Sequence, residues 1–251
     1  KPSQITPLSA YFLAEAFHKA ELPPGVFNLV TGRGAEVGNV LASHKDVDMI
    51  SFTGSTSGGI EVGKLALETV KKLALELGGK SPNLVLRGAD YHMAVSTSLN
   101  STFNNTGQTC SALTRLIVPK EDLQEIENII VEKSKGFIVG DPDEEETKVG
   151  PLSNKKQFEK VKYFVEKGIE EGAKLLVGEV PQKKDKGYFA NPVVFSKVSN
   201  KMEIAQEEIF GPVLCVIPYE GIEEGIEIAN DTIYGLSGAV FGPQEEAEDA
   251  A

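Results

Sequence analysis

Two short segments of the chain carry residue types that can do covalent chemistry. The segment FNNTGQTC, residues 103–110, ends a polar, glycine-bearing run on Cys110, one of two cysteines in the chain. The segment LELGGKSP, residues 75–82, places Glu76 at the end of an apolar run and directly before Leu77 and two glycines. A cysteine can serve as a nucleophile and a glutamate as a general base, so the pair is a candidate catalytic constellation.

Each of these residues also has a plain structural interpretation. A free cysteine is among the most often buried residue types, and Cys215 in the apolar run VLCVIPY is predicted to be a core residue of this kind. Cys110 lies instead in a connection rich in Asn, Thr, Gly and Gln, so it is expected to be reachable. Glu76 could form a strand-end ion pair with a lysine. A Cys/His dyad has little support, because no cysteine partner pattern surrounds the three histidines, His18, His44 and His92.

The segment TGRGAEVG, residues 31–38, follows an apolar run and opens a predicted helix, as a dinucleotide-binding turn does. Its glycines Gly32, Gly34 and Gly38 have the spacing GxGxxxG, which is one residue longer than the usual fingerprint. The segment therefore indicates either a cofactor turn or an ordinary strand-to-helix turn.

A second turn of this type occurs in SFTGSTSGG, residues 51–59. Gly54, Ser55 and Thr56 there precede a predicted helix, whose N-terminal N–H groups could receive a pyrophosphate. A simple helix cap explains Ser55 and Thr56 equally well. Two such turns close together favour a nucleotide ligand modestly over none.

The elements that must position these residues alternate between strand and helix. The first third predicts a helix over 7–20, strands over 25–30, 48–54 and 71–77, and helices over 35–44 and after residue 54. The second part predicts strands over 83–87 and 115–119 and helices over 90–105, from Leu123 to Ile130 and from Phe158 to Val165, with a surface loop over 140–154. This order predicts an α/β fold: a mostly parallel dinucleotide-type sheet in residues 1–77, and a second α/β domain, which bears Cys110, in residues 78–251.

The composition limits the class of function. The net charge of −12 argues against a nucleic-acid partner, and no apolar run approaches the ~18 residues that span a bilayer. Two cysteines without a CxxC or Cys/His cluster predict neither a disulfide framework nor a zinc site. We therefore expect a cytoplasmic protein without a metal. The first residue, Lys1, is not Met, so the segment is expected to come from inside a longer polypeptide.

Taken together, these segments resemble the NAD(P)-dependent aldehyde dehydrogenase superfamily over essentially the whole chain. LELGGKSP is similar to the active-site glutamate motif of that family and FNNTGQTC to its nucleophilic-cysteine motif. KPSQITP (1–7) and FTGS (52–55) precede them and EEIFGPV (207–213) follows, in the order of the family. The resemblance also implies that the off-register glycine turn belongs to a variant of the usual dinucleotide fold.

The resemblance implies a role for each matching residue. Cys110 is expected to be the nucleophile and Glu76 the general base that act on the same aldehyde carbon. The expected cofactor is NAD, with NADP as the alternative, because Gln4 stands where the family commonly has an acidic residue that repels a 2′-phosphate. The cofactor contacts implied are Lys1 and Gln4 at the adenosine ribose, Gly34 and Gly38 along the cofactor helix, Gly54 and Ser55 at the pyrophosphate, the Leu77 carbonyl at the nicotinamide amide, Glu208 at the nicotinamide ribose and Phe210 beside it.

The implied reaction is oxidation of a small aldehyde to a carboxylic acid through a thiohemiacetal and a thioester. The resemblance also implies that the chain lacks the N-terminal part of the family, which supplies an oxyanion asparagine, and a C-terminal part with a pocket loop and the segment for homo-oligomer formation. Two alternatives stay open: an inactive or truncated relative that acts as a nucleotide-binding or structural protein, and an acylating relative that passes the thioester to coenzyme A or phosphate.

Overall fold

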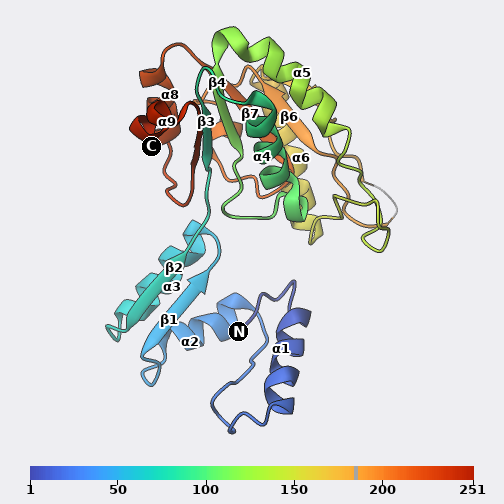
Figure 1. Ribbon diagram of the computed structural model, residues 1–251. Coiled ribbons are helices and arrows are strands. Elements are labelled where there is room, and N and C mark those ends of the chain that lie inside the picture. Colours follow the sequence, from blue (N-terminus) through green and yellow to red (C-terminus); the bar gives the residue numbers. More distant parts are fainter. Residues whose placement is uncertain (184–185) are drawn as a thin grey trace. The chain divides into compact units, whose positions relative to one another are not determined.

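A computed structural model describes residues 1–183 and 186–251 of the chain (Figure 1). The described residues form two compact units, Lys1–Leu77 and Gly78–Ala251. No helix in the described part of the chain is long and apolar enough to cross a bilayer.

The first unit contains a two-stranded parallel sheet with helices around it. Strand β1 pairs with β2 in parallel register, which places Thr53 opposite Glu76. The elements, in chain order, are α1 (Leu8–Lys19), a π-helical turn (Gly34–Gly38), α2 (Asn39–Ser43), β1 (Met49–Thr53), α3 (Thr56–Leu67) and β2 (Lys72–Glu76).

The predicted strand over residues 25–30 is wrong. This segment runs through a turn, in which the Asn28 side chain donates a hydrogen bond to the Gly25 carbonyl (2.8 Å), and continues as irregular backbone. Val26, Phe27 and Val30 are exposed, and none of the strands in the described residues pairs with the segment. An apolar run becomes a strand only where a neighbouring strand takes up its backbone hydrogen bonds, so the run alone was an insufficient signal.

The second unit is built on a six-stranded sheet of order β5–β6–β7–β4–β3–β8. All neighbours are parallel except β5 and β6, and edge strand β5 carries a bulge between Leu175 and Val177. The elements are β3 (Pro82–Val85), α4 (Tyr91–Phe103), a 3₁₀ turn (Asn104–Gly107), β4 (Arg115–Pro119), a second 3₁₀ turn (Lys120–Asp122), α5 (Leu123–Ser134), α6 (Lys155–Glu170), β5 (Lys174–Val177), β6 (Val193–Ser196), α7 (Glu203–Gln206), β7 (Val213–Tyr219), α8 (Ile222–Asn230), β8 (Ala239–Phe241) and α9 (Gln244–Ala250).

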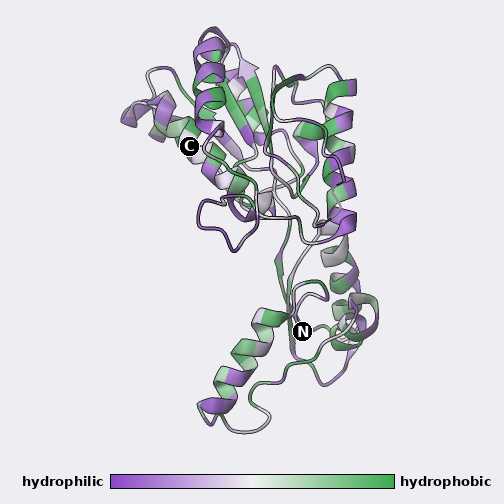
Figure 2. Ribbon diagram, turned by 90° about the vertical axis from the view of Figure 1, so that its right-hand side faces the viewer, coloured by the Kyte–Doolittle hydropathy of each residue, from purple (hydrophilic) through white to green (hydrophobic). Residues whose placement is uncertain are grey.

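Helices cover both faces of this sheet, because its strands are apolar on both sides. Alternate residues of β7 enter different cores: Cys215 and Ile217 pack with α6, whereas Leu214 and Val216 pack with α4 and α5. The strands of the larger unit are accordingly mostly green in Figure 2, and the helices around them carry both purple and green. The α/β class predicted for residues 78–251 is confirmed, and a parallel sheet buried on both faces is typical of that class.

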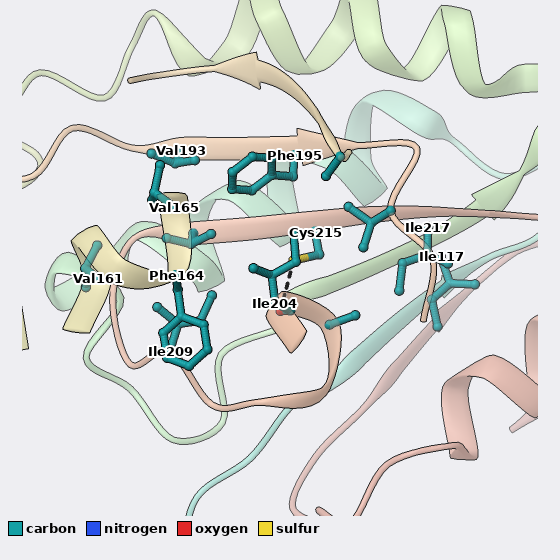
Figure 3. Packing of buried hydrophobic residues seen from close by; sticks show 14 of the residues in the cluster. Ile117, Val161, Phe164, Val165, Val193, Phe195, Ile204, Ile209, Cys215 and Ile217 are labelled. Atoms are coloured by element: carbon teal, nitrogen blue, oxygen red, sulfur yellow. Dashed lines mark hydrogen bonds between the residues drawn. The ribbon is translucent and has the colours of Figure 1, made fainter. Parts of the chain in front are cut away.

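Cys215 lies at the centre of the core that contains α6 (Figure 3). Its side chain is fully buried and its thiol donates a hydrogen bond to the Ile204 carbonyl (3.2 Å). Burial raises the pKa of this thiol. The prediction that Cys215 is a core residue is confirmed.

Candidate active site

The segment that carries Cys110 begins at the end of α4. Asp90 caps the first turn of this helix by accepting a hydrogen bond from the Met93 N–H (2.9 Å), and the helix ends at Phe103. The next residues leave the right-handed helix, with φ values of 50° at Asn105, 57° at Thr106 and 71° at Gly107. This left-handed turn directs the chain toward Cys110 and then into β4.

Cys110 itself is half-buried and unpaired with the other cysteine. Its carbonyl oxygen packs against Gly79, where a Cβ atom would lie 2.5 Å from that oxygen. The following residue is also held, because the Ser237 hydroxyl donates to the Ser111 carbonyl (3.0 Å). The predicted accessibility of Cys110 thus accompanies a closely packed backbone, whereas the thiol of Cys215 is sealed in hydrocarbon.

Gly79 also contacts Glu208, so one glycine joins two of the predicted site residues. The Gly79 N–H donates to Glu208 Oε1 (3.3 Å), and a Cβ at Gly78 would lie 2.5 Å from Glu208 Oε2. Burial raises the pKa of Glu208, while the Gly79 N–H and the ammonium groups of Lys160 and Lys80 oppose this rise. Gly79 is the position that excludes a side chain, because its Cβ would meet the backbone oxygen of Cys110, whereas a Cβ at Gly78 would meet only the end of the Glu208 side chain.

The loop that carries Glu208 is fastened to α6. The Gln157 side-chain amide donates to the carbonyls of Ile209 (2.9 Å) and Phe210 (2.7 Å), and Lys160 Nζ donates to the Glu208 carbonyl (2.6 Å). Phe210 has a φ of 58°, a left-handed conformation that is unusual for a bulky residue. Burial lowers the pKa of Lys160, and Glu208 opposes this change.

In the smaller unit, Glu76 ends β2 and is exposed. Its carbonyl accepts a hydrogen bond from the Gly54 N–H (3.0 Å), which sets the strand end beside the turn before α3. The Leu77 side chain packs on Gly59 of α3, where a Cβ would lie 2.6 Å from Leu77 Cδ2. Glu76, Leu77 and Gly54 are therefore neighbours at the carboxyl end of the two strands.

Ser55 occupies the N-cap of α3. Its hydroxyl accepts a hydrogen bond from the Gly58 N–H (3.2 Å), and Ser55 is exposed. The capping interpretation of this serine is confirmed, and it does not conflict with a phosphate contact at the same helix N-terminus.

A cavity of about 770 Å³ in the smaller unit is lined by Lys1, Gly34 and Gly38. No atom lies within 4 Å of a Cβ placed on either glycine, so their surface is open to a ligand. Gln4 is exposed and lies outside the lining of this cavity. Glu61 of α3 also lines it and accepts a hydrogen bond from the Asn39 side chain (3.0 Å).

The structure thus groups the predicted residues within each unit. Cys110 and Glu208 meet at Gly79 in the larger unit; Phe210 follows in the same loop. Lys1, Gly34 and Gly38 share the cavity of the smaller unit. Sequence reasoning missed Gln157, Lys160 and Glu61. Gln157 and Lys160 donate hydrogen bonds to backbone carbonyls. Every residue has a carbonyl, so no particular residue type in the sequence marks the partner of such a side chain.

The chain matches the aldehyde dehydrogenase family over residues 1–251. It is 49% identical to a 3-succinoylsemialdehyde-pyridine dehydrogenase of a Pseudomonas species, over 100% of this chain and 53% of that protein.

Two crystal structures show the same likeness. Aldehyde dehydrogenase C of Pseudomonas syringae, a cysteine-to-alanine variant in complex with NAD⁺ and octanal, has a TM-score of 0.96 and 48% identity, over 100% of this chain and 52% of that one. Betaine aldehyde dehydrogenase of Staphylococcus aureus in complex with NAD⁺ has a TM-score of 0.95 and 37% identity, over 99% and 50% of the two chains. The chain therefore spans about half the length of these relatives.

Proposed function

Because the chain belongs to the aldehyde dehydrogenase family, we propose that the enzyme that carries it oxidises an aldehyde to a carboxylic acid with NAD⁺. The observation that carries the proposal is the contrast between its cysteines: Cys110 is half-exposed at the end of a left-handed turn, whereas Cys215 is sealed in the core. A nucleophile must be reachable by substrate, and only Cys110 of the two is.

Cys110 is the nucleophile in this proposal. Its thiolate attacks the aldehyde carbon and forms a carbon–sulfur bond, which gives a thiohemiacetal with a negative charge on the former carbonyl oxygen. The Cys110 backbone N–H is a donor for this oxyanion, and the packing of the Cys110 carbonyl against Gly79 fixes the orientation of that segment.

Glu76 is the general base. After the oxidation step Cys110 holds a thioester, and Glu76 takes a proton from the water that attacks the thioester carbon. The carbon–sulfur bond then breaks, which releases the carboxylic acid and returns the thiolate. This hydrolytic role argues against an acylating relative, because transfer to coenzyme A would not need a base for water.

The residues present fit NAD. The open surfaces of Gly34 and Gly38 and the side chain of Lys1 line one cavity for the adenosine part, and Gly54 and Ser55 precede the α3 N-terminus for the pyrophosphate. Residues 1–77 are thus the proposed cofactor-binding domain and 78–251 the domain of the nucleophile. When bound, the nicotinamide accepts the hydride. The remaining proposed contacts are Gln4, the Leu77 carbonyl, Glu208 and Phe210.

Support for these roles comes from the relatives. The Pseudomonas syringae protein was crystallised with both NAD⁺ and an aldehyde in a variant whose cysteine is alanine, as expected where the cysteine consumes the aldehyde. A small aldehyde is therefore the proposed substrate class. NAD is preferred to NADP as the cofactor, because NAD⁺ is present in both structural relatives named above.

The test uses the full-length enzyme with NAD⁺ and a panel of aldehydes, followed by absorbance of the reduced nicotinamide. Cys110→Ala should abolish reduction, because no covalent adduct forms. Glu76→Gln should give a burst of reduced cofactor followed by slow turnover, because only hydrolysis of the thioester is impaired.

Cys215→Ala is the matched control and should retain the wild-type rate per folded molecule. Undiminished activity of Cys110→Ala would refute the assigned nucleophile. Nucleotide binding by the wild-type enzyme without reduction of any aldehyde would favour the nucleotide-binding alternative. Acceleration of Glu76→Gln to wild-type turnover by coenzyme A would favour the acylating one.

A further inference from the structure

The backbone immediately before Cys110 is strained. Asn105, Thr106 and Gly107 lie consecutively in the left-handed region, with φ values of 50°, 57° and 71°. A β-branched residue such as Thr106 is a true outlier there. A non-glycine residue in this region is strained and persists only where the surrounding structure over-determines it, which happens most often at functional sites.

Contacts with a second loop hold this turn in place. The Thr106 hydroxyl donates to the Gly150 carbonyl (3.2 Å), and the Ser153 N–H donates to Gln108 Oε1 (3.0 Å). Thr106 is only 5% exposed, so its hydroxyl bond is sheltered from water. Within the turn, the Asn105 side chain donates to the Gln108 carbonyl (3.1 Å).

The turn also packs against the loop that carries Glu208. A Cβ on Gly107 would lie 2.1 Å from the carbonyl carbon of Gly211, so the two backbones touch directly. Beyond the turn, the Cys110 carbonyl packs on Gly79 and Ser237 holds Ser111. The segment 105–111 is therefore fixed at both ends, with Cys110 between the two fixed points.

From this arrangement we infer that Thr106 and Gln108 are positioning residues for Cys110. Their hydrogen bonds to residues 150–153 hold the left-handed turn, and the turn sets where the thiol and the backbone N–H of Cys110 lie. This inference relies on the proposed function for its effect on turnover, but the effect on the thiol itself does not depend on which reaction the enzyme performs.

Thr106 offers a matched pair of variants. Thr106→Val keeps the branched shape and removes the hydroxyl, so the left-handed turn loses its bond to Gly150. Thr106→Ser keeps the hydroxyl and removes the methyl group that makes the turn strained. A role in packing alone would affect the serine variant, which loses volume, more than the valine variant.

The first readout is turnover in the full-length enzyme. Thr106→Val should lower kcat about 10-fold with the KM for NAD⁺ unchanged, because a small displacement of a reacting group costs rate without touching the cofactor site. Thr106→Ser should keep kcat within about threefold of the wild type, since the hydrogen bond remains. A Thr106→Val enzyme with wild-type kcat, or a serine variant as slow as the valine variant, would overturn the inference.

The second readout is alkylation by iodoacetamide, followed on the two cysteine-containing peptides by mass spectrometry. In Thr106→Val, Cys110 should react faster than in the wild type, because a loosened segment exposes a half-buried thiol. Cys215 is the internal reference: it is sealed in the core and reacts only when the larger unit opens. Parallel increases at both cysteines would show general destabilisation and contradict a positioning role.

The two proposals fail separately. If Cys110→Ala keeps full activity, the assigned nucleophile is wrong, yet selective acceleration of Cys110 alkylation in Thr106→Val would still support the positioning role. If Cys110→Ala is inactive and Cys110 alkylation is the same in Thr106→Val and the wild type, the proposed function stands and the positioning role is refuted.

Discussion

Glu208 illustrates how a site residue can work against the stability of its own fold. Burial raises the pKa of this carboxyl, which means that the folded state favours the neutral form more than water does. In the proposed function the Glu208 carboxylate accepts hydrogen bonds from ribose hydroxyls, and burial makes this charged form less favourable in the free protein than it is in water. We expect such a residue to be replaceable without loss of stability.

Glu208→Gln should weaken NAD⁺ binding and leave stability intact. Loss of charged hydrogen bonds worth about 1.5–3 kcal/mol should raise the KM for NAD⁺ about 10- to 100-fold. The amide oxygen of glutamine can still accept the Gly79 N–H, so the free energy of unfolding at pH 7 should be equal to or above that of the wild type. Urea unfolding and steady-state kinetics measure the two effects.

The same shift fixes the direction of the pH dependence. Because the pKa of Glu208 is raised in the folded state, the wild type loses stability as the pH rises through this pKa and the buried carboxyl ionises. The stability advantage of Glu208→Gln over the wild type should therefore shrink as the pH falls through the same pKa. NAD⁺ affinity of the wild type should fall over that range as the carboxylate is protonated, and that of Glu208→Gln should not. A variant with the wild-type pH profile would assign the titration to another group.

The candidate catalytic residues were recognisable from the sequence, and the residues that fix the backbone around them were not. Cys110 and Cys215 were separated by the polarity of their flanking residues, and the structure gives them the exposures expected from that difference. Thr106 was not foreseen as a turn residue, because threonine disfavours the left-handed region and nothing local announces a hydrogen bond to Gly150.

At the scale of elements, Arg115 of β4 joins three parts of the larger unit. Its fully buried guanidinium donates to the Lys80 carbonyl (2.8 Å), to Asn200 Oδ1 (3.1 Å) and to the last carbonyls of α8, those of Ile228 (2.7 Å) and Ala229 (2.8 Å). A cation at a helix C-terminus meets both the free carbonyls and the negative end of the helix dipole.

Arg115→Lys should destabilise the larger unit by about 2–4 kcal/mol, because one ammonium cannot replace a fork of four hydrogen bonds and leaves buried carbonyls unpaired. Arg87→Lys is the control: Arg87 pairs with Glu121 on an exposed surface, where the exchange should cost about 0–1 kcal/mol. Chemical unfolding of the two variants measures the difference. Equal losses would mean that the α8 carbonyls find other donors.

The local pattern predicted a strand correctly where the segment also found a neighbouring strand to pair with. The apolar runs that became β3, β4 and β7 lie in a sheet covered on both faces. The helices predicted from Leu123 and Phe158 bury their apolar faces in the two cores. Residues 25–30 had the same apolar character and formed no strand. Sheet formation depends on a partner far along the chain, which a local pattern does not contain.

At the scale of the whole molecule, the two units differ in how much they bury. The larger unit has two apolar cores. In residues 1–77 the buried positions are Ala42, Gly59, Gly63, Ala66 and Lys71, and α1 buries none of its side chains. Most large hydrophobic side chains that are exposed, among them Leu8 and Phe12, belong to the smaller unit. Local opening should therefore be easiest there.

Hydrogen exchange of the 251-residue chain should show this difference directly. Amides of β4 and β7 should exchange by global unfolding, whereas those of β1 and β2 should open at a cost lower by about 3 kcal/mol or more. Peptide-resolved mass spectrometry measures both sets in one sample. Equal protection in the two units would contradict the unequal burial as the source of stability.

The bulge in β5 bears on how the protein behaves at high concentration. An edge strand exposes unpaired N–H and C=O groups that a strand of another chain could pair with. The extra residue between Leu175 and Val177 breaks the regular spacing of these groups, so a regular strand cannot pair along the whole edge. Amyloid-like stacking needs an uninterrupted ladder of such groups, so this border of the sheet is protected against it. Deleting one residue to remove the bulge would give a regular edge strand and a protein more prone to form fibres.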